Sequence, residues 1–113
     1  MAIAISNETD YLMTAVDTTV LSDIIPGTYR FEWDLGPMGA ADTIVINVKL
    51  KIRGTGVAAL GVSQTFSFSN VQAVPVKTAI EVLQAKTGGQ ILISASQSAG
   101  TLRTCAFSMA RIV

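Results

Sequence analysis

Residues 28–35, with the sequence TYRFEWDL, alternate apolar and polar side chains at every second position. Tyr29, Phe31, Trp33 and Leu35 fall on one side of this alternation, and an arginine and two acids fall on the other. Because successive side chains of a strand point to opposite faces of a sheet, this period of two predicts a β-strand with one face in a core. Proline and glycine flank the stretch on both sides, which is typical of turns.

The same alternation recurs farther along the chain. Residues 43–53 predict a half-buried strand that bends or ends early, because a fully extended run of this length would span about 36 Å. We expect this strand to pair with residues 28–35 as a hairpin partner or close neighbour. Residues 57–69 predict a strand with two phenylalanines on one face, residues 90–96 a central strand that is apolar on both faces, and residues 101–113 a final strand.

Two shorter segments are less regular. Pro75 interrupts an apolar piece and predicts an edge strand or an extended loop there, because proline has no N–H for a ladder. Residues 77–86 have some helix propensity, but we interpret them as a strand or an irregular stretch.

Turn signals separate these predicted strands at intervals of 8 to 15 residues along a chain of 113 residues. This pattern predicts an all-β fold, a single-domain antiparallel β-sandwich or jelly roll. We assign residues 26–113 to the sandwich core, and residues 1–25 to an N-terminal arm and the first strands of the same domain. The arm is expected either to pack on its own domain or to reach a partner.

The composition points to burial between protein chains. Half of the residues are hydrophobic and only 14% are charged, whereas soluble domains carry about 25% charged residues. Every apolar run is shorter than the roughly 20 residues of a membrane span, and the first residues lack the features of a signal peptide. We therefore expect synthesis in the cytoplasm, no membrane partner, and an apolar surplus that is covered by other subunits.

The charges and reactive residues exclude several classes of function. The net charge is zero without a basic cluster, so we expect no nucleic-acid partner. The chain has no histidine, and its glycines form no phosphate-binding loop, dinucleotide fingerprint or nucleophile elbow. Cys105 is the only cysteine and is expected to be a small core residue. We therefore expect no catalytic residues, no metal site and no cofactor.

Two rows of charge remain as candidate sites. Glu32 and Asp34 lie two residues apart and have the spacing to flank a sugar or hold calcium, although a solvated face is the simpler interpretation. Lys49, Lys51 and Arg53 form a cationic row that suits an anionic ligand or protects an edge strand. A third interpretation is that the two rows face each other across neighbouring strands.

Trp33 and Tyr29 have the chemistry of a sugar-stacking platform, as in carbohydrate-binding modules. Their alternation with charged residues favours burial in the core instead.

Three segments together resemble small virion proteins of tailed bacteriophages: residues 25–35 (IPGTYRFEWDL), 39–44 (GAADTI) and 96–101 (SQSAGT). In those proteins a G-x-Y-x-hydrophobic strand, a G-D-x-hydrophobic strand start and a closing Q-x-A-G-T turn recur in a β-sandwich on the capsid surface. The chain lacks the aromatic residue expected after that closing turn. The resemblance implies a head decoration or cement protein that binds capsid subunits from outside, often as a trimer.

The functional hypothesis from the sequence is therefore a structural virion protein that decorates a capsid. Its expected partners are the major capsid protein and further copies of itself, as a homo-oligomer such as a trimer, and its expected location is the virion. The alternatives are a carbohydrate-binding adhesion module or spike, and a tail or neck component of the same particle. Accessibility of Trp33 separates a sugar platform from a core strand.

Overall fold

The computed structural model describes residues 3–52, 59–84 and 88–112. These residues form eight strands and no helix, so none of the described segments is a helix of the length and apolarity that a bilayer span requires. The strands are β1 (Ile3–Leu12), β2 (Thr18–Asp23), β3 (Gly27–Asp34), β4 (Thr43–Lys51), β5 (Gly61–Ser69), β6 (Val76–Leu83), β7 (Gln90–Ala99) and β8 (Thr104–Ile112).

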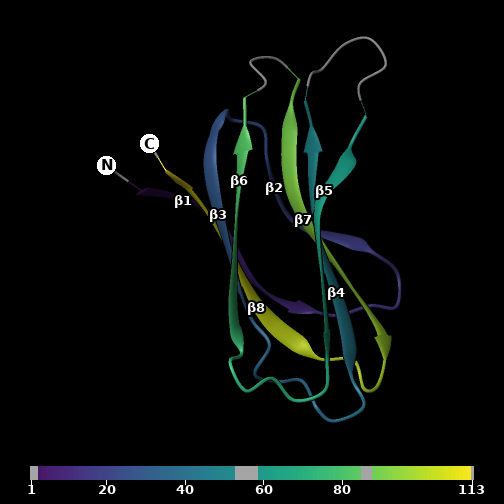
Figure 1. The fold of residues 1–113 in the computed structure, drawn as a ribbon. Coiled ribbons are helices and arrows are strands. Elements are labelled where there is room, and N and C mark those ends of the chain that lie inside the picture. The colour runs from purple at the N-terminus through teal and green to yellow at the C-terminus, as the bar shows by residue number, and fades with distance from the viewer. Residues whose placement is uncertain (1–2, 53–58, 85–87, 113) are drawn as a thin grey trace.

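The eight strands build two antiparallel sheets that pack face to face (Figure 1). Sheet A has the strand order β1-β8-β3-β6, and sheet B has the order β2-β7-β4-β5. The first strand thus pairs with the last, the second with the next to last, and so on inward to β4 and β5. This nested pairing is the connectivity of a jelly roll, and the predicted fold class is confirmed.

The stretch of residues 28–35, which forms most of β3 and the residue after it, lies at the centre of the core. Tyr29, Phe31, Trp33 and Leu35 are all buried, as their alternation predicts. Each such side chain contributes roughly 1.5–3 kcal/mol when it leaves water, so this face of β3 is a large part of the stabilising free energy. Sheet B supplies most of the opposing layer, namely Leu21, Ile44, Ile46, Val48, Ile91, Ile93 and Ala95.

The expected pairing of β3 with β4 is wrong, because the two strands lie in different sheets. The connection between them crosses from sheet A to sheet B, so β4 pairs with β5 and β7 instead. The prediction that the strand ends early is confirmed, since β4 stops at Lys51. The apolar–polar alternation of residues 43–53 places Ile52 on the core face, but Ile52 follows the end of the strand and is 75% exposed, and Arg53 lies outside the described residues.

The remaining segments form the edges of the sandwich. In the N-terminal segment 1–25, β1 and β2 are the edge strands of sheets A and B on one side. On the other side the edges are β6 and β5. Residues 76–83 are a strand, in agreement with the interpretation of residues 77–86, and Pro75 lies in the loop before it.

Candidate functional site

A shallow groove of about 520 Å³ runs over the outer face of sheet A. Its floor is Ala106 and Ser108 of β8, and its walls carry Glu8 and Asp10 from β1 on one side and acids from β3 on the other. The β3 acids are the pair that the sequence singles out, Glu32 and Asp34. The fold therefore adds a second acidic pair that the sequence alone could not place beside the first.

The two acidic pairs lie on either side of β8. Neighbouring strands lie about 4.8 Å apart, so the pairs are separated by roughly 10 Å at the backbone. Glu32 also forms an ion pair with Arg30 at 3.3 Å. Among the described residues there is no group of three or more acids, cysteines or histidines arranged to hold a metal ion. The groove is an acidic surface.

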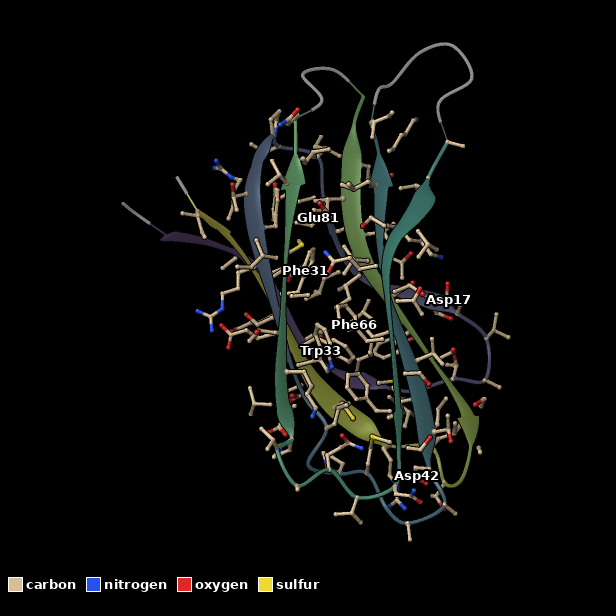
Figure 2. All side chains as sticks on the ribbon, viewed as in Figure 1. Asp17, Phe31, Trp33, Asp42, Phe66 and Glu81 are labelled. Atoms are coloured by element: carbon tan, nitrogen blue, oxygen red, sulfur yellow. The ribbon has the colours of Figure 1, made fainter. Side chains whose placement is uncertain are left out.

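Lys49 and Lys51 of the cationic row lie on the other sheet, so neither makes the predicted contact with Glu32 and Asp34, and Arg53 is outside the described residues. Lys49 of β4 instead contacts Asp17, with 2.5 Å between Nζ and Oδ2. Asn47 donates a longer hydrogen bond to the same carboxylate, and Lys51 is half-buried at the end of β4. The Lys49 contact ties the β1–β2 connection to the outer face of sheet B (Figure 2).

Trp33 and Tyr29 are buried, as the core interpretation predicts, and neither offers a ring to a sugar. Trp33 is 2% exposed and packs between the sheets against Phe66, with 5.4 Å between the ring centroids (Figure 2). The hydroxyl of Tyr29 donates a hydrogen bond to the carbonyl of Ile25, and burial raises its pKa to about 12. All seven aromatic side chains of the sequence are buried or half-buried.

Cys105 lies in the core, as expected. Burial raises the pKa of its thiol to about 11, with Asp34 and Asp42 acting in the same direction. The side chain is therefore a neutral thiol near pH 7, the form that packs as a small apolar group and reacts slowly.

A buried carboxylate, which the sequence did not single out as a site, organises one end of the sandwich. Asp42 is 2% exposed, and its Oδ2 accepts hydrogen bonds from Arg103 Nε at 2.6 Å and from the Gly39 amide at 2.7 Å. Its Oδ1 accepts from the Thr101 amide at 3.1 Å. The hydrogen bond from Gly39 and the nearby guanidinium hold the pKa of Asp42 below its usual range, so the group is ionised and its partners are charge-assisted.

Gln97 completes this cluster with both ends of its amide. Its Nε2 donates to the carbonyls of Ala99 and Thr101, and its Oε1 accepts from the Arg103 amide. The backbone N–H of Gln97 donates a hydrogen bond to the backbone carbonyl of Thr14, so the cluster also holds the β1–β2 connection. The segments 39–44 and 96–101, which carry the virion-protein resemblance, thus contact each other. Together they hold the β1–β2, β3–β4 and β7–β8 connections at one end of the sandwich.

The outer face of β6 carries a largely apolar row of side chains. Val76, Thr78, Ile80 and Val82 alternate with inward residues and are all exposed. We call these four residues the β6 strip. Beside it β3 presents polar side chains, so the strip is an isolated apolar margin of sheet A. Exposed apolar patches bordered by polar residues are typical of protein interaction surfaces.

Comparison with known proteins gives no relative: neither a protein-family model nor a curated protein matches this sequence. The surfaces of the described residues are suited to binding through area and charge, with the β6 strip as the apolar part and the groove as the acidic part.

Proposed function

We propose that the chain is a structural virion protein of a bacteriophage that decorates the outside of the capsid and stabilises the shell through protein–protein contacts. The observation that carries this proposal is the β6 strip, where three aliphatic side chains remain exposed on the edge of a well-packed sandwich. Val74 extends the apolar surface into the preceding loop. The resemblance of segments 25–35, 39–44 and 96–101 to small virion proteins supports the same function.

The fold supports the proposal at the level of architecture alone. Jelly rolls serve as viral capsid domains, and they also serve as lectins and cupins, so the connectivity does not select one function. The carbohydrate-binding alternative depended on Trp33 and Tyr29, and these two residues are in the core. A capsid-surface role uses the exposed apolar margin that the fold leaves uncovered.

The mechanism we propose is a clamp that binds only the assembled shell. A ligand that binds one state and not another stabilises that state by mass action, so contacts that exist only between assembled subunits oppose disassembly. A specific contact removes about 800 Å² from each partner, which is more than the strip alone provides. The strip would be the apolar centre of a larger contact made by each copy of a homo-oligomer such as a trimer.

Labelling of virions tests the location. An antibody against the purified protein, detected with gold particles by electron microscopy, is applied to particles of the phage whose genome encodes the chain. Label on the head supports the proposal. Label on the tail or neck assigns the chain to the other structural candidate and overturns decoration, and purified virions without the protein overturn a virion role altogether.

A matched pair of variants tests the surface. Ile80 in the β6 strip and Leu12 at the opposite edge of sheet A are both 59% exposed. Ile80→Asp is expected to weaken binding to shells lacking the protein by about tenfold or more, since 1.4 kcal/mol is tenfold in affinity. Leu12→Asp adds the same charge and is expected to bind like the wild type. Co-sedimentation with the shells measures the binding of each variant. If both variants lose the same affinity, or if neither loses any, the assignment of the β6 strip as the binding surface is contradicted.

A further inference from the structure

The edge of β6 has an alternating set of backbone groups that face away from β3. Ile80 lies opposite Arg30 in the register, and its carbonyl accepts a hydrogen bond from the side chain of Gln64 rather than from β3. The Val82 amide likewise donates to the side chain of Glu81. Because bonding alternates along an antiparallel ladder, Val76, Thr78, Ile80 and Val82 direct their N–H and C=O groups to the open edge.

An edge of this kind is a template for another strand. A row of unpaired N–H and C=O groups pairs readily with a further chain, and flat exposed edges lead to aggregation. A second copy of the same protein carries the same open edge. Two β6 strands related by a twofold axis would pair antiparallel, and the aliphatic residues of both strips would then lie on one continuous face.

Two side chains occupy the C-terminal half of this edge. Gln64 reaches across from β5, the edge strand of the other sheet, and its Nε2 lies 2.8 Å from the Ile80 carbonyl oxygen. Glu81 accepts from the Val82 amide at 3.1 Å through Oε1, and from Gln64 Nε2 at 3.1 Å through Oε2. The two side chains are therefore joined to each other as well as to the edge.

The positions of the two residues allow this arrangement. Both are half-buried and alternate with outward-facing neighbours, so they point into the space between the two edge strands (Figure 2 labels Glu81). Lys77, also inward on β6, places its Nζ 5.2 Å from the ring centroid of Phe68 on β5. Inward-pointing charged residues on an edge strand are a known obstacle to strand addition, because pairing would bury them further.

We propose that Gln64 and Glu81 form a plug that closes the C-terminal half of the β6 edge to strand addition by a second copy of this chain. Partners then reach β6 through the outward β6 strip and not through its backbone. This inference goes beyond the proposed function and does not depend on it, since the plug would act in the free protein before any shell is present.

The first test removes the plug. In the double variant Gln64→Ala with Glu81→Ala, the carbonyl of Ile80 and the amide of Val82 become available. We expect the dissociation constant for self-association to fall roughly tenfold or more relative to the wild type, since a net hydrogen bond contributes about 1 kcal/mol and two are gained. Light scattering across a dilution series measures the mass, and Ser67→Ala, an exposed position of β5, is the control.

A proline on the same edge identifies the surface responsible. Thr78→Pro added to the double variant removes an N–H that faces the open edge, a position where a strand tolerates proline. The added proline is expected to return the mass to that of the wild type. Self-association that persists with the proline, or a folded double variant with the mass of the wild type throughout, overturns the proposal.

The second test needs no variant, so it holds even where the double variant does not fold. The amides of Val82 and Thr78 both face the open edge, but only Val82 lies at the plug. We expect the Val82 amide of the wild-type protein to exchange with deuterium about tenfold more slowly than the Thr78 amide, measured by NMR. Equal exchange of the two amides would show that the plug does not hold the edge in solution.

Discussion

Gly100 shows how one residue joins distant parts of the chain. Its backbone has a φ of +85°, and a Cβ at this position would lie 1.9 Å from Oδ1 of Asp42. The carboxylate approaches so closely because Thr101, the next residue, donates its amide to the same oxygen. The absence of a side chain at Gly100 is therefore what lets the β7–β8 turn close over Asp42.

Gly100→Ala is expected to lower the free energy of unfolding by about 2 kcal/mol or more, because it adds both a strained φ and a clash with a carboxylate. Urea unfolding followed by circular dichroism measures this change. Gly61→Ala is the control, since a Cβ there meets nothing within 4 Å, and its expected effect is within about 0.5 kcal/mol. Similar losses in both variants would contradict the role given to Gly100.

For single residues, the sequence predicted correctly which side chains of residues 28–35 are buried, but it did not predict which distant side chains contact each other. The period of two around Trp33 reports which face a side chain takes, and that face was correct for all four apolar residues of the stretch. The partner of Asp42 could not be predicted in the same way. Arg103 lies 61 positions away, and no local pattern encodes a contact over such a separation.

At the scale of the elements, β5 and β3 lie at the same lateral side of the sandwich core, in opposite sheets. Phe66 and Phe68 of β5 both pack against the ring of Trp33, at 5.4 Å and 6.4 Å between centroids. Aromatic pairs of this kind contribute about 0.5–1.5 kcal/mol beyond the area they bury. They are therefore a principal apolar contact between the two sheets on the side where β5 and β6 form the edges.

Phe66→Ala is expected to lower the free energy of unfolding by about 2–3 kcal/mol, less than for a fully buried phenylalanine because Phe66 is half-buried. The only tryptophan of the chain reports the change directly, since its fluorescence should shift to longer wavelength as water reaches Trp33. Val62→Ala on the same strand removes an exposed apolar group and should leave the emission unchanged. An unshifted spectrum in Phe66→Ala would contradict the packing described here.

Strand pairing was the part of the fold that the sequence could not supply. Alternation predicted most strands with useful boundaries, and the short run in residues 90–96 correctly indicated an interior strand. The prediction that β3 pairs with β4 was wrong. An alternation of period two indicates which side chains of a strand face the core, but it does not indicate which strand lies beside it in the sheet. The acidic groove arises from the pairing of β1, β8 and β3, and the contact of Gln64 with Glu81 arises from the packing of the two sheets, so the sequence alone predicted neither.

At the scale of the whole molecule, ionisable groups limit stability at both ends of the pH range. Asp42 is held below its usual pKa first by the Gly39 amide and then by Arg103. Burial raises the pKa of Asp17, but the hydrogen bond from Lys49 and others outweigh it. Burial raises the pKa values of Tyr29 and Cys105, to about 12 and about 11.

These directions predict a dome of stability against pH. A lowered carboxyl pKa stabilises the fold above its ordinary value of 3.8, and this contribution is lost as the pH falls through the lower folded value. A raised pKa stabilises the fold below the ordinary values of 9.0 for Cys105 and 10.0 for Tyr29, and is lost as the pH rises toward about 11 and about 12. Urea unfolding at several pH values measures both limbs.

Tyr29→Phe provides the control for the alkaline limb. It removes one of the two titrating groups, so the decline of stability between pH 10.0 and about 12 should become shallower while the acid limb stays the same. The variant also loses the hydrogen bond to Ile25, which lowers stability at neutral pH by about 1 kcal/mol. An alkaline limb unchanged in Tyr29→Phe would contradict the assignment.

The nested pairing of the strands also governs the order in which the chain can fold. Among the strands of the described residues, only β4 and β5 are neighbours in sequence that also pair, whereas β1 pairs with β8. During synthesis β1 and β2 therefore leave the ribosome long before β8 and β7 exist to receive them. Folds dominated by such distant pairings form in milliseconds to seconds, slowly for a chain of this size. Sheet A is complete only after β8 has been synthesised. Until then β3 lacks its β8 neighbour, and its apolar side chains are less well covered.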